Sequence, residues 1–247
     1  MERLSATMHN RAEEGPVPHA ALGLSANLPQ AEPCTNGQLS AIPALRGVTL
    51  YHISKRLCDI FFSLIGIVLL LPVFLLIALC IKLDDGGKII HLREIVGYQG
   101  RRFRALKFRT MIPDADTYLA QHPELMRKFQ QNMKLLKDPR VTRVGKFLRR
   151  TSLDELPQLF NVLVGQMSLV GPRMIHPSEL PRYGDYAQKR LSVKPGITGL
   201  WQISARQHIS YDERIRLDMH YIDTRSFIGD LAILVKTVKV FIIHTGL

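Results

Sequence analysis

Residues 60–81 read IFFSLIGIVLLLPVFLLIALCI, a run of 22 residues without a charged side chain. As one straight helix this run would be about 33 Å long, close to the thickness of a bilayer's hydrocarbon core. Pro72 stands in the middle of the run, where it removes a backbone hydrogen bond and kinks a helix. Each half would be only about 18 Å long, too short to cross a bilayer alone. The run therefore predicts an apolar helix that bends at Pro72.

Charged residues flank the apolar run on both sides. Asp59 immediately precedes it, and basic residues stand before and after it, namely Lys55, Arg56, Lys82, Lys88 and Arg93. A spanning helix normally has more Lys and Arg on one side, whereas two basic flanks suit a hairpin that enters and leaves by the same membrane face. Three alternatives stay open: a spanning helix, a re-entrant hairpin over residues 51–85, and a buried helix of a soluble protein.

The net charge of the 247-residue chain is +12, and it is unevenly distributed. Residues 86–150 hold 16 Lys and Arg against 5 Asp and Glu, so +11 lies in 65 residues. Such a segment indicates an anionic partner, either lipid headgroups or a phosphate-binding pocket. Because no helix-turn-helix, RNP-type or zinc signature accompanies the charge, nucleic acid is not expected. Three cysteines and an apolar fraction of 46% argue against a disulfide scaffold and a polytopic transporter.

Composition divides the chain into three parts. Residues 1–50 are rich in Pro, Gly and Ala without apolar periodicity and predict a disordered tail. Residues 51–85 contain the apolar run and form the candidate membrane segment, and residues 86–247 predict a small, mostly helical α+β domain. Its expected strands are 89–97 and 103–109, the second alternating apolar and basic side chains. Its expected helices are 115–136 with an interruption at Pro123, 141–150, and an amphipathic, interfacial C-terminal helix around 231–242.

Two adjacent acids, Asp154 and Glu155, follow the basic segment and have two interpretations. Ser152 and Glu155 match a capping box at the start of a helix. A helix that begins near Asp154 would place Pro157 in the first turn, where its missing N–H is tolerated. Alternatively, two carboxylates close to many cations indicate a metal and phosphate site. The residues alone leave both interpretations open.

Two turns contribute further candidates. Gly171-Pro172-Arg173 is a rigid turn that presents an arginine suited to bidentate phosphate contacts. Lys194-Pro195-Gly196-Ile197-Thr198-Gly199 predicts a second turn, followed by Trp201, which we interpret as a core residue, and by Arg206. The nine histidines show no metal-binding spacing, and there is no P-loop and no GxGxxG motif.

Taken together, these segments resemble the bacterial sugar transferases, which are monotopic polyprenyl-phosphate phosphoglycosyl transferases. The similarity covers roughly residues 52–245, and its last part, Gly199-Leu200-Trp201-Gln202-Ile203-Ser204, is most similar to ExoY-type exopolysaccharide production enzymes. The matching motifs are Lys55-Arg56 with Asp59, the apolar run with Pro72, Lys107-Phe108-Arg109-Thr110-Met111, Asp138-Pro139-Arg140-Val141-Thr142, Leu148–Leu159, Met167–Arg173 and Lys194–Trp201.

The resemblance implies an enzyme that transfers a sugar-1-phosphate, with galactose or glucose as the sugar, from a UDP-sugar to undecaprenyl phosphate. UMP would be released, and the product would start an exopolysaccharide repeat unit. Asp154 matches the family nucleophile, which forms a covalent phosphosugar intermediate and contacts Mg²⁺, and Glu155 matches its dyad partner. By position, the expected substrate-binding residues are Lys107, Arg109, Arg149, Pro172, Arg173 and Arg206.

The resemblance also implies the re-entrant alternative at Pro72 and a catalytic domain on the cytoplasmic face of the bacterial inner membrane, against anionic phospholipid. A homodimer is compatible with the family. Two other functions remain open from the residues alone. One is a non-catalytic basic membrane adaptor, and the other is a Leloir-type glycosyltransferase that uses Asp114-Ala115-Asp116 and releases UDP.

The sequence departs from the common family pattern at a few positions. Leu71 replaces the Ser that often precedes the hairpin proline, and Met174 replaces a frequent second proline. Ala205 stands where a Gly often precedes Arg206, and Arg225 stands where a Trp is common. The last two departures affect the expected sugar and base contacts, but not the dyad.

Overall fold

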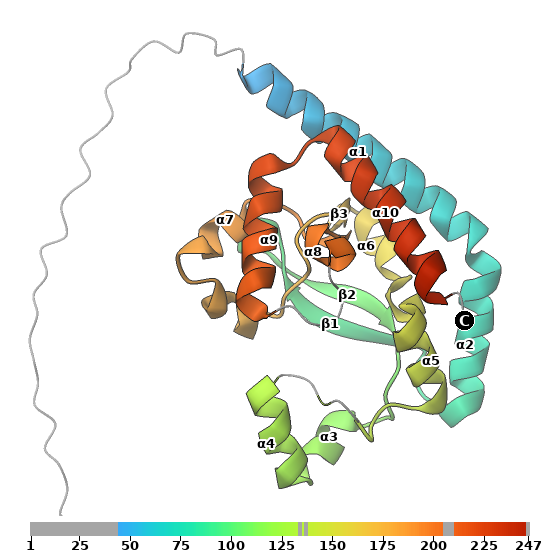
Figure 1. Ribbon diagram of the computed structural model, residues 1–247. Helices are drawn as coiled ribbons and strands as arrows, with labels where there is room; N and C mark the ends of the chain where they lie inside the picture. The colour runs from blue at the N-terminus through green and yellow to red at the C-terminus, as the bar shows by residue number, and fades with distance from the viewer. Residues whose placement is uncertain (1–43, 133–134, 136–137, 205–209, 246–247) are drawn as a thin grey trace, which may run out of the picture. The chain divides into compact units, whose positions relative to one another are not determined.

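The computed structural model describes residues 44–132, 135, 138–204 and 210–245. The chain divides into two units, Met1–Ile42 and Pro43–Leu247, and all described residues belong to the second unit. The predicted tail thus lies largely outside the described residues, and helix α1 begins at Ala44, within the range assigned to that tail. The described part combines helices with two small sheets, in agreement with the predicted α+β class (Figure 1).

The apolar run forms two helices, α1 (Ala44–Leu69) and α2 (Leu71–Asp85). They meet at an angle of 60°, so the predicted bend at Pro72 is confirmed. Pro72 lies in the first turn of α2, where its fixed φ suits a helix start and its missing N–H costs no hydrogen bond. At the other end, Gly86 adopts a left-handed φ of 71° and closes α2 by donating its N–H to the Lys82 carbonyl.

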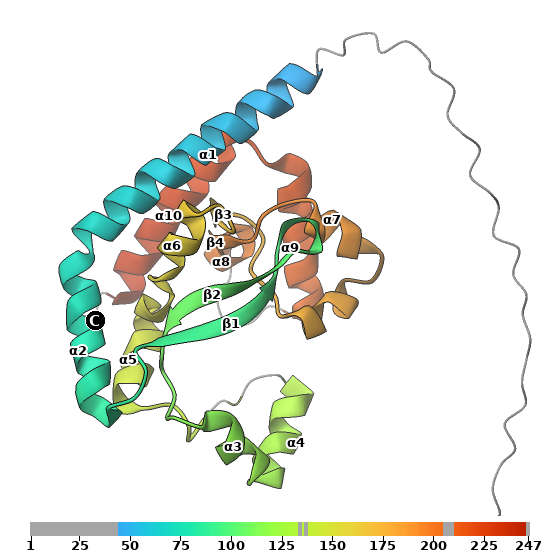
Figure 2. The ribbon, with the colours of Figure 1, turned by 180° about the vertical axis from the view of Figure 1, so that it is seen from behind.

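Much of the surface of these helices is apolar and exposed. Fourteen large apolar side chains between Leu50 on α1 and Leu83 on α2 are 38–77% exposed, and α10 (Phe227–Thr245) adds Ile228, Leu231, Val235 and Val238 to the exposed apolar surface. Helix α10 runs beside α1 in both views (Figures 1 and 2). In the described ranges no helix has by itself the length and apolar character needed to cross a bilayer. Only Leu50–Leu69 and Leu71–Asp85 together meet both criteria.

The first sheet is an antiparallel hairpin of β1 (Ile90–Val96) and β2 (Arg102–Phe108), paired from Ile90–Phe108 to Val96–Arg102. Both strands confirm the predicted ones. A tight turn, η1 (Tyr98–Gly100), joins them. Helix α6 (Gln158–Leu163) packs on β2, where the Asn161 amide accepts from the Leu106 N–H and donates to the Arg104 carbonyl. The hairpin therefore packs β2 against α6, the helix that follows the two acids.

The second sheet joins two segments that lie far apart in the sequence. Strand β3 (Ser168–Val170) pairs in parallel with β4 (Gly196–Thr198). The predicted turn over residues 194–199 is thus wrong in part, because its centre is a strand. Gly196 is required at this point, since a Cβ atom there would lie 2.2 Å from the Gly171 backbone nitrogen. This close backbone contact fixes the turn that carries Arg173.

Two apolar clusters hold the elements together. The larger one lies between the β1–β2 hairpin and helices α6, α9 and α10, around Ile95, Ala105, Val162 and Met167. The smaller one consists of Ile77, Ile81, Phe108 and Leu148, and it packs α2 against the end of β2 and α5. The remaining elements are α3 (Ala115–Ala120), α4 (Pro123–Asn132), α5 (Arg143–Thr151), η2 (Leu153–Glu155), η3 (Pro177–Tyr186), α7 (Ala187–Leu191), α8 (Leu200–Ser204) and α9 (Tyr211–Thr224).

Candidate active site

The two acids lie in a short 3₁₀ turn between α5 and α6. Helix α5 ends at Thr151, and Ser152 takes a left-handed φ of 56° that reverses the chain. Asp154 and Glu155 follow in η2. Pro157 lies just before α6, where no helical hydrogen bond requires a backbone N–H, so its missing N–H is tolerated. The Ser152 side chain makes no capping hydrogen bond. The capping-box interpretation is therefore wrong, and the Glu155 carboxylate is engaged elsewhere.

Glu155 is paired with two cations from separate parts of the fold. Lys107 Nζ on β2 donates to Glu155 Oε1 at 2.7 Å, and an Arg173 guanidinium nitrogen approaches the same oxygen at 3.3 Å. Burial alone would raise the pKa of Glu155, but Arg173 and Lys107 outweigh it and hold that pKa at about 2. Glu155 is thus a permanently ionised group that brings Lys107 and Arg173 together.

Asp154 has a different environment, although it is the adjacent residue. Its side chain is mostly buried, and the ion pair that the structure gives it is a long one, 3.9 Å from Oδ2 to Lys107 Nζ. Burial raises the pKa of Asp154, the neighbouring Glu155 charge adds to that effect, and Lys107 and Arg149 act against it. The two carboxylates therefore have pKa values displaced in opposite directions, which is typical of groups with different chemical roles.

Arg149 completes the cationic side of the site from α5. Its Nε donates to Thr110 Oγ1 at 2.8 Å, which fixes the guanidinium beside the dyad. Burial lowers the pKa of Arg149, and the charge of Asp154 opposes that shift. The backbone of α5 packs closely on the backbone at Thr110 because residue 145 is glycine. A Cβ atom at this position would lie 2.0 Å from the Thr110 carbonyl oxygen. Thr110 belongs to a motif quoted above, but its side chain was not assigned a role from the sequence.

The structure does not bring all predicted substrate-binding residues to this site. Arg109 points the other way and binds Asp85 at the end of α2 and the Lys88 carbonyl. Pro172 is fully buried, so it shapes the turn that presents Arg173. Arg206 lies outside the described residues. Of the predicted cations, Lys107 and Arg173 pair with the dyad, and Arg149 lies close enough for its charge to lower the pKa of Asp154.

Trp201 is buried, as predicted for a core residue, and it is also flanked by arginines. The Arg173 guanidinium lies 5.5 Å from the ring centroid, and that of Arg214 on α9 lies 4.9 Å from it. Both distances fall within the range of a cation–π interaction. Sequence patterns gave no signal for Arg214, because only the fold brings α9 next to α8.

The charged residues before the apolar run do not simply mark a membrane boundary. Arg56 donates to the Val162 and Leu163 carbonyls at 2.7 and 2.8 Å and so caps the end of α6. Asp59 accepts from the Ser168 hydroxyl and the Leu169 N–H of β3 at 3.1 and 2.9 Å. These contacts hold α1 directly against α6, which follows the dyad, and against β3, which precedes the turn that carries Arg173.

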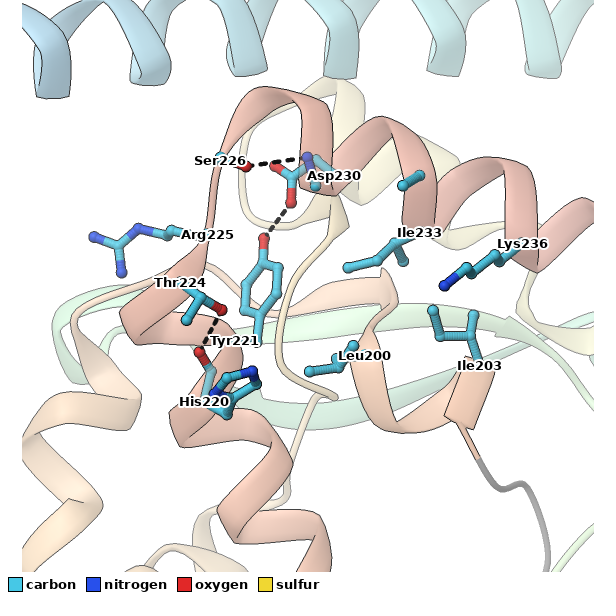
Figure 3. Close-up of a pocket in the computed structure, with 12 residues that line it drawn as sticks. Leu200, Ile203, His220, Tyr221, Thr224, Arg225, Ser226, Asp230, Ile233 and Lys236 are labelled. Atoms are coloured by element: carbon cyan, nitrogen blue, oxygen red, sulfur yellow. Dashed lines mark hydrogen bonds between the residues drawn. The ribbon is translucent and has the colours of Figure 1, made fainter.

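Lys55 enters a buried polar cluster around Asp230 on α10. Lys55 Nζ lies 2.6 Å from Asp230 Oδ2 and also donates to the Val170 carbonyl at 2.9 Å. The Tyr51 and Tyr221 hydroxyls donate to Asp230 at 3.0 and 2.8 Å. Figure 3 shows the Tyr221 contact at the edge of a cavity of about 190 Å³ between α8, α9 and α10. Dyad residues are absent from the lining of this cavity, so it is separate from the candidate active site.

The side chains at the dyad offer few ligands for a magnesium ion. Among the described residues, no group of three or more His, Cys, Asp or Glu side chains could hold a metal ion. Asp154 offers a carboxylate without a close ion pair, whereas that of Glu155 is already bound to cations. Mg²⁺ is commonly held by one or two carboxylates together with substrate phosphates. The residues therefore fit an ion that arrives with a diphosphate, not a closed protein cage.

The described residues thus combine a buried carboxylate, cations next to it and an exposed apolar helical surface. Comparison with known sequences identifies the family that has this combination. The bacterial sugar transferase family matches residues 50–244, and the chain belongs to that family.

Several relatives cover most of the chain. It is 41% identical to the exopolysaccharide production protein ExoY of Sinorhizobium fredii over 198 residues, or 78% of this chain and 88% of ExoY. It is 40% identical to an uncharacterised sugar transferase of Haemophilus influenzae (86% of this chain, 52% of the relative). It is 44% identical to the undecaprenyl-phosphate galactose phosphotransferase of Salmonella typhimurium (78% and 41%). The chain thus spans about half the length of the latter two and most of ExoY.

Proposed function

We propose that this protein is a polyprenyl-phosphate sugar phosphotransferase that moves a sugar-1-phosphate from a UDP-sugar to undecaprenyl phosphate. The observation that carries the proposal is the asymmetry of the dyad. Glu155 binds two cations closely, whereas Asp154 stays 3.9 Å from the nearer one. The name of the Salmonella relative supports the lipid acceptor and makes galactose the first sugar to test, with glucose as the second.

The reaction proceeds in two displacements at one phosphorus atom. An Asp154 carboxylate oxygen attacks the sugar-linked phosphorus, the bond to the bridging oxygen of the diphosphate breaks, and UMP leaves with that oxygen. A phosphate oxygen of undecaprenyl phosphate then attacks the same phosphorus, and the bond to Asp154 breaks. The products are undecaprenyl diphosphate-sugar and free Asp154, so the sum is an exchange of UMP for the lipid phosphate. The product would start an exopolysaccharide repeat unit.

Cations are essential for both steps, because a carboxylate must approach a doubly charged diphosphate. Lys107 and Arg173, held in place by Glu155, and Arg149, held by Thr110, are positioned to offset that charge. Asp154 and the diphosphate would together hold Mg²⁺, which supplies further neutralisation of phosphate charge when bound.

We also propose that the exposed apolar surface of α1, α2 and α10 lies in the cytoplasmic leaflet of the inner membrane, with the α1–α2 bend forming a re-entrant hairpin. Each large apolar side chain moved from water into hydrocarbon contributes about 1.5–3 kcal/mol. The surface from Leu50 to Leu83 is therefore sufficient to hold the protein on a bilayer. Cysteines introduced at positions 50 and 86 should both react with an impermeant reagent from the cytoplasmic side. Labelling from opposite sides would contradict the hairpin.

The released nucleotide tests the function directly. Purified protein in lipid nanodiscs is supplied with UDP-galactose or UDP-glucose, undecaprenyl phosphate and Mg²⁺, and the nucleotide is identified by chromatography. We expect UMP, in an amount equal to the lipid-linked product. UDP would indicate a glycosyltransferase that transfers the sugar alone, and no nucleotide release with any UDP-sugar would indicate a non-catalytic adaptor.

The pH profile should change when the lysine of the dyad is removed. Asp154 reacts as a carboxylate, so kcat/KM for UMP release should rise with pH as this group ionises. Because Lys107 lowers the pKa of Asp154, the rise should move to higher pH in Lys107→Met. Lys128→Met makes the same change at an exposed lysine. This variant serves as the control and should keep the wild-type pH profile. An unchanged or lower midpoint in Lys107→Met would contradict the assigned role of Asp154.

A further inference from the structure

Arg190 on α7 is a fully buried cation without an obvious structural reason. Its relative exposure is 0%, and one guanidinium nitrogen donates to the Arg173 carbonyl at 2.7 Å. Within the described residues, its Nε and other terminal nitrogen have no hydrogen-bond partner. Burial of an arginine is unfavourable unless its charge is compensated, so its position next to the main chain of Arg173 needs an explanation.

Asp218 on α9 is a second buried charge, 3% exposed, and the charge of Arg190 acts on its carboxylate. The Tyr183 hydroxyl donates to Asp218 Oδ2 at 2.9 Å. Burial raises the pKa of Asp218 to about 6, although Arg190, Tyr183 and the backbone amide of Arg173 all favour its charged form. Arg190 therefore holds the main chain of Arg173 at its carbonyl, and Asp218, which is held by Tyr183, places a buried negative charge behind it.

The Arg173 backbone is held on the sheet side as well, by a parallel bridge to Gly196. From this fixed position the side chain reaches Glu155 at 3.3 Å and lies over Trp201 at 5.5 Å. The Glu155 contact is already at the long end of hydrogen-bond distances, so a small shift of the backbone would break it. The location of Arg173 thus depends on the buried pair behind it.

We propose that Arg190 and Asp218 are positioning residues that set Arg173 against Glu155 and the diphosphate. The proposal rests on the proposed phosphotransfer function for its kinetic consequence. It does not require either residue to touch substrate, and it explains why charged side chains occupy a place that apolar ones could fill.

The first test compares Arg190→Met with Lys189→Met, the same change at the preceding residue of α7. Lys189 is partly exposed and pairs with Asp223 on the surface. We expect kcat/KM for UMP release to fall about 10- to 100-fold in Arg190→Met, because small misplacements of a catalytic group have effects of this size. Lys189→Met should stay within about twofold of the wild type. Equal values for the two variants would overturn the proposal.

A double-mutant cycle separates positioning from a general loss of stability. If Arg190 acts through Arg173, the change Arg190→Met should add less than about twofold to the defect of Arg173→Met. Independent, multiplying defects would show that Arg190 acts by another route and would overturn the proposal. Tyr183→Phe removes one hydrogen bond to Asp218 and keeps the ring, so it supplies a milder variant if Arg190→Met fails to fold. Its smaller defect should likewise vanish in the Arg173→Met background.

The fluorescence of Trp201, the single tryptophan in the sequence, supplies a measurement that does not depend on enzyme activity. Since Arg173 lies over Trp201, a displaced guanidinium should change the Trp201 emission spectrum. We expect a change in Arg190→Met and in Tyr183→Phe, none in Lys189→Met, and no further change when Arg173 is already Met. A wild-type protein that releases no UMP would overturn the proposed function alone, while the fluorescence comparison would still decide whether the pair positions Arg173.

Discussion

Asp154→Asn should lower the rate of UMP release by about 10⁴-fold or more, since loss of a nucleophile removes both displacements at once. Asparagine has nearly the same size and lacks the charge, so Lys107 and Arg149 should stay in place. The covalent intermediate of the proposed mechanism provides a second measurement. Intact-protein mass spectrometry with UDP-sugar and without lipid acceptor should show one added sugar phosphate in the wild type, and none in Asp154→Asn.

The matched control is Asp185→Asn, which makes the same change at an exposed carboxylate on η3. It should keep wild-type turnover and the mass adduct. Trp201 fluorescence checks that both variants are folded. Turnover by Asp154→Asn within tenfold of the wild type, or an adduct on another residue, would show that the nucleophile has been assigned to the wrong group.

The second large effect is expected on stability, at the cluster around Asp230. Asp230→Asn keeps the size but leaves one acceptor oxygen where the Tyr51 and Tyr221 hydroxyls now use two, and it removes the charged partner of the mostly buried Lys55 ammonium. Removing one member of a buried ion pair commonly lowers the free energy of unfolding by about 3–5 kcal/mol. We expect a decrease of this size in denaturant unfolding followed by Trp201 fluorescence in detergent micelles.

Glu94→Gln provides the comparison for this change. Its pair with Arg102 lies on the surface of the β1–β2 hairpin, with side chains 48% and 68% exposed, and such pairs contribute about 0–1 kcal/mol. Equal small effects of the two substitutions would mean that Lys55 finds another partner. A double change of Lys55→Met with Asp230→Asn should recover part of the lost stability, because no unpaired charge then remains buried.

Local patterns predicted the elements that are determined by their own sequence. The second strand of the first sheet followed from its alternation and the first from its extended pattern, and the helix that carries Arg149 followed from its amphipathic spacing. Pro72 bends the apolar run as proline chemistry requires. The adjacent acids were interpreted either as part of a capping box or as a metal and phosphate site, and the arginine after Gly171-Pro172 as a phosphate ligand; the structure brings Glu155 and Arg173 within 3.3 Å of each other.

Predictions that depended on long-range contacts were less successful. The segment over residues 194–199 has the composition of a turn, but its centre pairs with β3 because the backbones meet at Gly171 and Gly196. Arginine is a residue type that often binds phosphate, but the Arg109 guanidinium forms an ion pair with Asp85 instead. Lys55 and Arg56 were interpreted from membrane topology, whereas their partners are carbonyl groups more than a hundred residues away. None of these partners is visible from neighbouring residues.

The contacts of Arg56 and Asp59 have a practical consequence for shortening this protein. A version that starts at residue 86 would look like a self-contained enzyme freed from its anchor. It would, however, leave the Val162 and Leu163 carbonyls without their arginine, and the Leu169 amide without its carboxylate. The helix that we propose lies in the membrane is therefore also an internal brace of the rest of the fold. Exchanging this helix between relatives should succeed only when its polar residues are transferred along with the apolar ones.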